Sequence, residues 1–264
     1  MAAMDHDLPP LLALADKLAE AARAAILPYF RAAPAVEHKG GGRFDPVTDA
    51  DKDAERVMRA LIAREFPDHS ILGEEFGGAF ADEGYQWILD PIDGTRAFIA
   101  GLPTWGVLIG LYHDGEPLIG VIDQPYLDER YRGWMTGANA SARGTTQALR
   151  TRACAKLGEA ILSTTDQNLF RDEEASAFSR VRERARLTRY GYDCYAYAMV
   201  AAGHMDCVIE SGLKTFDVAA LIPILAGAGG GLCAWDGGVA HQGGRTLAWG
   251  DVRVRDEAQA LIAV

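Results

Sequence analysis

The sequence predicts a layered α/β fold, because segments with helical periodicity alternate with short β-rich runs along the chain. Length and composition support this class. The chain has 264 residues, of which 49% are hydrophobic and 24% charged, as in ordinary globular domains. A chain of this length buries roughly three quarters of its unfolded surface, so we expect a core that needs no disulfide or metal to hold it together.

The first elements expected are two helices. Apolar residues recur at helical spacing after the Pro9-Pro10 pair and predict a helix over residues 11–30. A glycine-rich segment at 39–43 predicts a loop. A second helix is predicted over residues 49–65.

Short strands follow these helices. Apolar runs predict strands near 71–72 and over 86–89, and we expect Asp90-Pro91 to end the second. The β-rich runs 106–112 and 117–123 flank His-Asp-Gly-Glu, which is typical of a hairpin turn. We expect residues 130–136 to add a further strand.

The character of the chain changes near Gly144, and we therefore expect two parts. Residues 1–143 form an N-terminal α+β part that carries most metal ligands, and residues 144–264 form a C-terminal α/β part. In the second part, strands are predicted at 160–163, 205–209 and 231–235, and helices at 172–186, 195–202 and 216–226.

Composition excludes several classes of partner. Lys and Arg number 26 and Asp and Glu 37, giving a net charge of −11, which argues against nonspecific nucleic-acid binding and against docking on anionic lipid. The four cysteines form no CxxC pair, so neither a zinc site nor a disulfide framework is expected. The start lacks an apolar signal region, and the longest apolar run, 99–112, is interrupted by Pro103 and is too short to span a membrane. We expect a cytoplasmic protein.

Two carboxylates lie within four residues in the segment DPIDGT at 90–95, where an apolar run ends. They repel each other unless a cation lies between them, and hard ions such as Mg²⁺ prefer carboxylate, carbonyl and water oxygens. Asp90, Asp93 and the carbonyl of Ile92 are therefore candidate Mg²⁺ ligands. Gly94 and Thr95 would open a helix, whose free N–H groups and positive dipole end favour phosphate.

Helix capping is the alternative explanation for several of the acids. Asp93 could satisfy the first N–H groups of the helix after it, and Asp217 those of the apolar helix that it opens. Asp51 could lie in a first helical turn, where acids suit the helix dipole. Glu74 and Glu75, taken alone, indicate a solvated surface pair.

Together these segments resemble the inositol monophosphatase family of metal-dependent phosphatases. Residues 87–95 (WILDPIDGT) and 216–220 (FDVAA) match its two signature motifs, and Gly-Glu-Glu at 73–75 matches its acidic element. The motifs follow the family's order, and the resemblance extends from Lys39 to Gly231. It implies a five-layered αβαβα sandwich, a homodimer, and dependence on Mg²⁺ with two or three ions in each active site.

The resemblance also implies a role for each matching residue. The metal ligands would be Glu74, Asp90, Asp93 and Asp217, joined by the carbonyl of Ile92. Asp51, Glu74 and Thr95 would be catalytic: Asp51 and Thr95 would orient the attacking water, and Glu74 would support it through the metals. The Gly94 and Thr95 amides would hold the phosphate. Lys39 falls near the family's mobile-loop lysine, in a loop that is one residue longer here.

Residues 96–106, 193–197 and 210–217 resemble the histidinol-phosphate phosphatase branch. In inositol-specific members the stretch around Asp193 is usually small and uncharged, and Glu210 matches a glutamate that contacts the non-phosphate part of the substrate. L-Histidinol phosphate carries an ammonium and a titratable imidazole, which carboxylates suit through charge-assisted hydrogen bonds. Asp193 could instead cap the helix that follows it.

We therefore expect a small-molecule phosphate monoester as substrate, hydrolysed with Mg²⁺ by direct water attack. The substrate is predicted to be L-histidinol phosphate, in histidine biosynthesis. An inositol-1-monophosphatase or another sugar or polyol monophosphatase is the first alternative. A bisphosphorylated-nucleotide phosphatase would need a basic pocket that the sequence does not reveal. A divalent-ion-binding protein without turnover is the non-enzymatic alternative, against which the complete set of acids argues.

Overall fold

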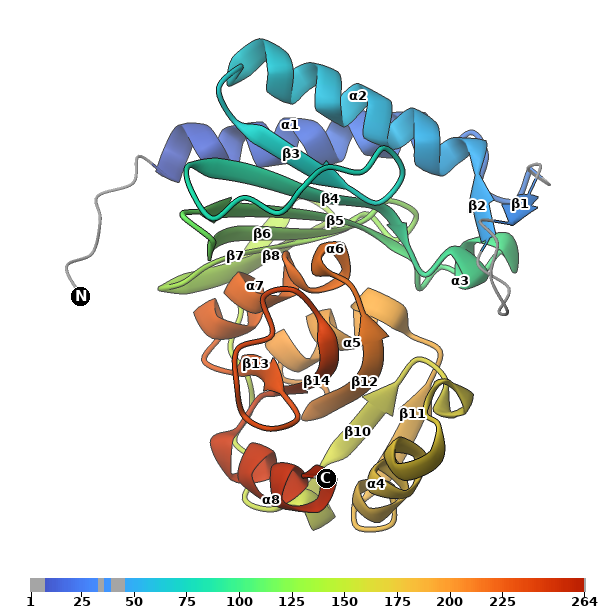
Figure 1. The fold of residues 1–264 in the computed structure, drawn as a ribbon, viewed down its shortest axis with the longest axis vertical. Coiled ribbons are helices and arrows are strands. Elements are labelled where there is room, and N and C mark those ends of the chain that lie inside the picture. Colours follow the sequence, from blue (N-terminus) through green and yellow to red (C-terminus); the bar gives the residue numbers. More distant parts are fainter. Residues whose placement is uncertain (1–7, 33–35, 39–45, 264) are drawn as a thin grey trace.

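A computed structural model describes residues 8–32, 36–38 and 46–263. The described chain forms five layers: two helices, a seven-stranded sheet, a middle layer of helices, a five-stranded sheet and two outer helices (Figure 1). The predicted αβαβα sandwich is confirmed. Each sheet is covered on both faces, as the long apolar runs in its strands require.

The first layer consists of α1 (Leu8–Ile26) and α2 (Asp49–Glu65), which pack on each other and against the seven-stranded sheet (Figure 1). The second helix has the predicted bounds. The first begins earlier than predicted and ends at Ile26 instead of Phe30. The Pro9-Pro10 pair lies inside its first turn, where no helical hydrogen bond needs the missing N–H groups. Its buried stripe has helical spacing and consists of Leu11, Leu14, Ala15, Leu18, Ala19, Ala22 and Ile26.

The seven-stranded sheet has the order β3-β4-β5-β6-β7-β8-β9, with only β3 and β4 parallel. Its strands are β3 (Ser70–Gly73), β4 (Tyr85–Asp93), β5 (Gly106–His113), β6 (Glu116–Gln124), β7 (Glu129–Trp134), β8 (Gly137–Ala142) and β9 (Thr145–Ala148). The predicted hairpin turn is confirmed, with Asp114 and Gly115 both at positive φ. A separate pair is formed by β1 (Val36–His38) and β2 (Pro46–Thr48). The division of the chain at residue 144 stays a prediction, and β9 lies just beyond it.

One expectation about this sheet is wrong: Asp90-Pro91 does not end the strand. β4 continues to Asp93, and its pairing with β5 shifts register between Asp90 and Asp93. Proline lacks the N–H that a regular ladder needs, and an irregularity of this kind accommodates it. The irregular stretch brings both aspartates to the same end of the strand.

The middle layer consists of α5 (Asp193–Ala201), α6 (Thr215–Val218) and α7 (Leu221–Gly227). The single helix predicted over 216–226 is wrong, because it is divided in two. Pro223 has no N–H to offer the carbonyl of Ala219, so the first helix is not continued. Close packing fixes the position of the second: a Cβ on Gly120 would lie 1.9 Å from the carbonyl oxygen of Ala220.

The five-stranded sheet has the order β11-β10-β12-β14-β13. Its strands are β10 (Ile161–Thr164), β11 (Leu187–Tyr190), β12 (Cys207–Leu213), β13 (Gly231–Ala234) and β14 (Gly244–Trp249). Its outer face is covered by α4 (Asp172–Arg182) and α8 (Val252–Ile262) (Figure 1). Three short helical segments complete the chain: α3 (Thr95–Ile99), η1 (Leu157–Glu159) and η2 (Gln167–Leu169).

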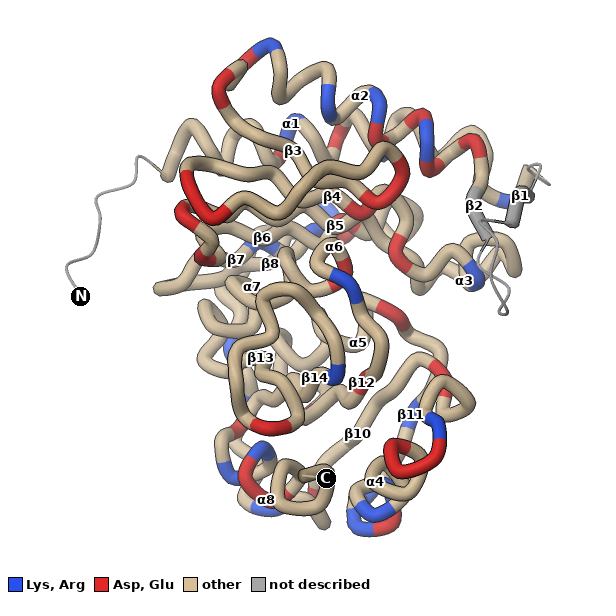
Figure 2. The backbone as a smooth tube through the Cα atoms, viewed as in Figure 1, with Lys and Arg blue, Asp and Glu red and all other residues tan. Residues whose placement is uncertain are grey.

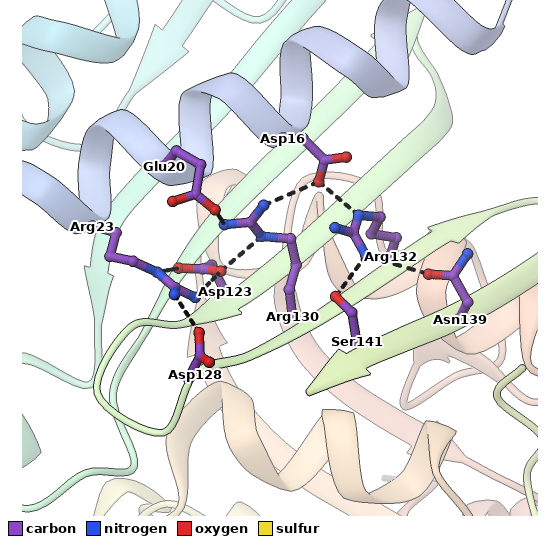
Figure 3. A network of polar contacts seen from close by, with 9 residues as sticks. All are labelled: Asp16, Glu20, Arg23, Asp123, Asp128, Arg130, Arg132, Asn139 and Ser141. Carbon is purple, nitrogen blue, oxygen red and sulfur yellow. Dashed lines mark hydrogen bonds and ion pairs between the residues drawn. The ribbon is translucent and has the colours of Figure 1, made fainter. Parts of the chain in front are cut away.

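A network of ion pairs fastens α1 to the seven-stranded sheet (Figure 3). Buried Asp123 accepts hydrogen bonds from Arg130 at 2.8 Å and from Arg23 at 3.0 Å. Arg130 also donates to Glu20 at 2.6 Å and to Asp16 at 3.2 Å. Asp123 and Arg130 are both buried, and each forms ion pairs with more than one partner. The network therefore holds α1 in one register on the sheet.

Positions of Lys and Arg alternate with positions of Asp and Glu along the described elements (Figure 2). No helix within residues 8–32 and 46–263 has both the length and the apolar character that a membrane crossing requires.

Candidate active site

An acidic cluster lies where β4 ends. Asp90 and Asp93 come from this strand and Asp217 from α6, and the three each place one carboxylate oxygen within 4.8 Å of the others. Asp90 is fully buried and the other two are half-buried. Three carboxylates this close match the all-oxygen coordination that Mg²⁺ prefers.

A backbone N–H orients each carboxylate of this cluster. Asp90 accepts from Ile92 at 3.1 Å, Asp217 accepts from Lys214 at 2.6 Å, and Asp93 accepts from Cys194 at 2.6 Å. The capping explanation is therefore confirmed for Asp217, whose bond belongs to the start of its own helix. It is wrong for Asp93, which binds the first turn of α5 instead of the helix that follows it.

Glu74 is held in a tight turn by Glu55, which the sequence analysis missed. Glu55 lies buried on α2 and accepts from the N–H groups of Glu75 at 2.7 Å and Phe76 at 3.2 Å. Arg59, one turn later, donates to it at 2.7 Å. A Cβ on residue 73 would lie 1.9 Å from the Glu55 carboxylate, so only glycine fits there. A glycine directly before two acids indicates that another group lies close to the backbone there, but it does not identify that group.

We expect Glu55→Gln to lower the free energy of unfolding by about 1–3 kcal/mol, because it leaves Arg59 without its charge partner and one backbone N–H without an acceptor. The Mg²⁺ concentration for half-maximal activity should rise as well, since Glu74 loses its support. Urea denaturation and Mg²⁺ titration measure the two effects. Glu65→Gln, on the same helix but in a surface ion pair with Lys17, should change neither. Equal effects of the two variants would contradict this role.

The structure places Asp51 and Thr95 in separate hydrogen-bonded units. Asp51 is buried in a capping box, where it accepts from the N–H and the hydroxyl of Thr48 at 2.8 and 2.6 Å. The predicted place in a first helical turn is confirmed. Thr95 donates its hydroxyl to the carbonyl of Ile92 at 3.1 Å. Within the described residues no hydrogen bond joins Asp51 to Thr95, and their shared catalytic role stays a prediction. Lys39 lies outside the described residues.

A cavity of about 400 Å³ opens above the acidic cluster. Most predicted site residues line it: Glu74, Asp90, Ile92, Asp93, Gly94, Thr95, Asp193 and Asp217. Its wall also contains two cations that the sequence analysis did not single out, Arg96 and Lys214. They lie next to recognised motifs, but nothing in their spacing showed that they would face the same space. Asp51 is not among the lining residues.

Asp193 is seated directly against the predicted phosphate-binding loop. It is the first residue of α5, it has φ 47°, and its side chain makes no capping bond. A Cβ on Gly94 would lie 2.9 Å from its carboxyl carbon. The capping explanation is therefore wrong for Asp193. A non-glycine residue in this left-handed conformation costs energy, which the surrounding structure must offset.

Glu210 lies behind Asp193 on β12. It is buried and accepts from the N–H of Thr165 at 2.6 Å and from the hydroxyl of Thr164 at 3.2 Å. A recess of about 20 Å³ beside the main cavity is lined by Asp193, Glu210 and Asp93 together. The two predicted substrate contacts are thus brought into one place from an α-helix and a β-strand.

Burial and mutual repulsion raise the pKa values of these acids. In each case burial is the larger cause, and neighbouring carboxylates add to it. The pKa is raised to about 6 for Asp51 and Asp93, to about 7 for Glu210 and to about 8 for Asp193. For Asp90 and Asp217 it lies well above the ordinary value. A bound cation would relieve this repulsion.

Without metal, we expect the protein to become less stable as the pH rises from about 4 to about 8. The folded-state pKa values of Asp51, Asp93, Glu210 and Asp193 exceed the ordinary carboxyl values near 4. The native state then binds more protons than the unfolded chain across this window, and its stability falls with pH. Thermal unfolding in EDTA at pH 5, 6.5 and 8 measures the slope.

Mg²⁺ should reverse this dependence of stability on pH, because its ligands must lose their protons to bind it. The increase in melting temperature on adding Mg²⁺ should be larger at pH 8 than at pH 5. A metal-free melting temperature that rises from pH 5 to pH 8 would contradict the assignment of raised pKa values.

A layered α/β sandwich with clustered carboxylates at a strand end defines a class of hydrolase, the phosphatases that use carboxylate-bound divalent metal ions. The chain belongs to the inositol monophosphatase family, whose model matches residues 7–263. It is accordingly a hydrolase of phosphate monoesters, in a family that generally depends on Mg²⁺.

Individual relatives carry two kinds of name. The chain is 44% identical over 235 residues to a chloroplastic bifunctional phosphatase of Arabidopsis thaliana, in a match covering 88% of this chain and 66% of the plant protein. It is 36% identical over 231 residues to a histidinol-phosphatase of Chlorobaculum parvum, covering 87% and 86% of the two chains. An inositol monophosphatase structure from Zymomonas mobilis superposes with a TM-score of 0.87 at 38% identity, over 98% of this chain and 100% of the other.

Proposed function

We propose that this phosphatase acts on L-histidinol phosphate and releases phosphate by direct attack of water. The observation that carries the proposal is a second pair of carboxylates beside the metal cluster. Asp193 abuts Gly94, and Glu210 shares its recess. Once the clustered acids bind metal, this pair is left to meet the positively charged end of the substrate through charge-assisted hydrogen bonds.

The donor set fits Mg²⁺, because it consists of oxygen atoms that are crowded and partly desolvated. Two or three ions would be held by Glu74, Asp90, Asp93 and Asp217, with the carbonyl of Ile92. Bound there, the metal supplies positive charge to the phosphate and acidifies water.

The chain's own groups would complete the reaction. Gly94 has no side chain and φ 83°, so its N–H and that of Thr95 can approach the phosphate closely. Lys214 and Arg96 on the cavity wall offset further phosphate charge. The Thr95 hydroxyl, released from the carbonyl of Ile92, and Asp51 would together orient the attacking water, and the raised pKa of Asp51 suits it to take up a proton.

An inositol or other polyol monophosphatase is the second candidate function. The close superposition on the Zymomonas mobilis inositol monophosphatase favours it, since that likeness extends over the whole chain. A neutral polyol gains less than a cation does from the Asp193 and Glu210 carboxylates, so we place it second.

We also infer a homodimer. The edge strand β11 leaves its outer backbone groups without a strand partner within the described chain, and it exposes two apolar side chains. Leu187 is 47% and Tyr190 41% exposed. An unpaired strand edge offers backbone groups with which another chain can pair. Measurement of the mass in solution, with Leu187→Lys as the disrupting variant, tests this inference. A cytoplasmic location stays a prediction.

A phosphate-release panel tests the substrate. The enzyme is assayed with L-histidinol phosphate, inositol 1-phosphate, fructose 1,6-bisphosphate and adenosine 3′,5′-bisphosphate, each with Mg²⁺ and with EDTA. We expect Mg²⁺-dependent release and the highest kcat/KM for L-histidinol phosphate. A higher value for inositol 1-phosphate would overturn the substrate assignment. Absence of release from all four substrates would favour a divalent-ion-binding protein.

A further inference from the structure

A second cavity, of about 330 Å³, lies between the seven-stranded sheet and α5. Strands β7, β8 and β9 form one wall and the helix forms the other. None of its lining residues lines the cavity over the acidic cluster. The two cavities are therefore separate, although α5 borders both.

The centre of this cavity wall is a carboxylate bound by two phenols. Glu129 accepts a hydrogen bond from Tyr131 at 2.7 Å and another from Tyr195 at 3.0 Å, both on its Oε2 atom. The two rings meet edge to face with centroids 6.4 Å apart. Burial and the neighbouring Glu129 raise the pKa of Tyr195 to about 12 and that of Tyr131 also, so the phenols keep their protons and add no charge.

The second oxygen of this carboxylate has no fixed partner. Within the described chain, Oε1 of Glu129 makes no hydrogen bond and no Lys or Arg pairs with it. No Lys or Arg lines the cavity. Besides the two tyrosine rings, Leu149 and Met199 contribute apolar surface, and exposed His204 stands among the lining residues. Ser141, Thr145 and Gln147 add uncharged polar groups to the wall. The cavity thus offers one anionic oxygen among aromatic, apolar and uncharged polar side chains.

We propose that Glu129, Tyr131 and Tyr195 form a binding site for a small organic cation, an ammonium group carried on an apolar body. The carboxylate supplies the counter-charge, and the faces of tyrosine rings attract cations. The volume is that of an ordinary small-molecule site. A bare divalent ion fits less well, because the wall offers a single carboxylate and its other oxygen groups are uncharged side chains.

The site is independent of the proposed substrate but connected to the active site by α5. Tyr195 and Met199 are four residues apart and face the second cavity together, while Asp193, at the start of the same helix, lines the catalytic cavity. A ligand here would therefore contact the helix that positions a predicted specificity residue, without entering the cavity where phosphate is hydrolysed.

The matched probes 2-phenylethylamine and 2-phenylethanol test the proposal, because they differ chiefly in the ammonium group. Binding is measured by calorimetry at pH 8 with saturating Mg²⁺. We expect one molecule of the amine to bind per chain. The alcohol should bind at least about tenfold more weakly, because the loss of a hydrogen bond between charged groups raises the dissociation constant by about that factor or more.

Two variants locate the bound probe. Glu129→Gln removes the charge and should weaken amine binding about tenfold or more. Thr145→Trp places a bulky side chain in the cavity from the exposed strand β9 and should block binding without disturbing the buried wall, so the test stands even if Glu129→Gln unfolds.

Two further variants serve as controls. Glu183→Gln makes the same charge change at an exposed site remote from the cavity and should leave the affinity unchanged. Asp193→Asn should also leave it unchanged, because Asp193 belongs to the other cavity. Equal affinity for amine and alcohol, no binding by the wild type, or binding lost in Asp193→Asn and kept in Glu129→Gln would each overturn the proposal.

Discussion

Asp90→Asn is expected to lower kcat on the order of 10³-fold or more at saturating Mg²⁺, with the fold retained. The substitution keeps the shape of the side chain but removes a charge that a divalent ion needs from a buried ligand. In EDTA the melting temperature should rise, because Asp90 is repelled by Glu74, Asp93 and Asp217 in the metal-free protein. Initial rates with L-histidinol phosphate and thermal unfolding in EDTA measure both effects.

The control for this variant is Asp68→Asn, which makes the same change at an exposed loop position outside the cavity. It should leave both kcat and the melting temperature unchanged. Near-normal turnover of Asp90→Asn at saturating Mg²⁺ would defeat the assignment of the cluster as the metal site. A large loss of turnover in Asp68→Asn would show that the assay responds to net charge alone.

Asp193→Asn is expected to lower kcat/KM selectively for L-histidinol phosphate. A hydrogen bond to a charged group contributes roughly 1.5–3 kcal/mol, which corresponds to about 10- to 150-fold in kcat/KM. With inositol 1-phosphate the loss should be small, because the metal cluster is untouched and the substrate carries no cation. The measurement is kcat/KM for both substrates in the wild type and the variant, with melting temperatures alongside.

The chain contains a matched control for this variant. Asp172 is the first residue of α4, as Asp193 is of α5, and the two have nearly equal positive φ values of 48° and 47°. Asp172 lies outside the catalytic cavity. Asp172→Asn should therefore show any change in melting temperature that the substitution causes at the start of a helix, and it should leave kcat/KM for both substrates unchanged. Parallel losses on both substrates in Asp193→Asn would remove Asp193 from the specificity pocket.

Local sequence predicted several of the elements and the part of the site that lies within single segments, but it did not predict β11, β14 or α8. The helix over 49–65 follows from its apolar spacing, and the hairpin turn follows from Asp114 and Gly115. The segment 90–95 keeps two carboxylates within four residues of each other, although the strand that carries them extends to Asp93 and does not end at Leu89 as predicted. Periodicity and turn chemistry act between neighbours in the chain, so they can be recognised without knowing the fold.

The resemblance to a family identified site residues in distant segments, whose proximity could not be predicted from their spacing along the chain. Asp217 joins Asp90 across more than a hundred residues, and only the family's motif order indicated that the two would meet. Spacing along the chain carries no information on such a contact, because it depends on how β4 and α6 pack together.

Tertiary structure alone decided which partner each buried group finds. Glu55 supports the Glu74 turn, and Asp93 accepts a hydrogen bond from the N–H of Cys194, on a helix 101 residues further along the chain. Pro223 breaks the helix predicted over 216–226, but the position of α7 after the break is fixed by its close packing against Gly120. A buried N–H or carboxylate must be satisfied, but the sequence does not state by which group. That choice is made only when distant segments are packed together, because the contact distances and the exclusion of water arise there.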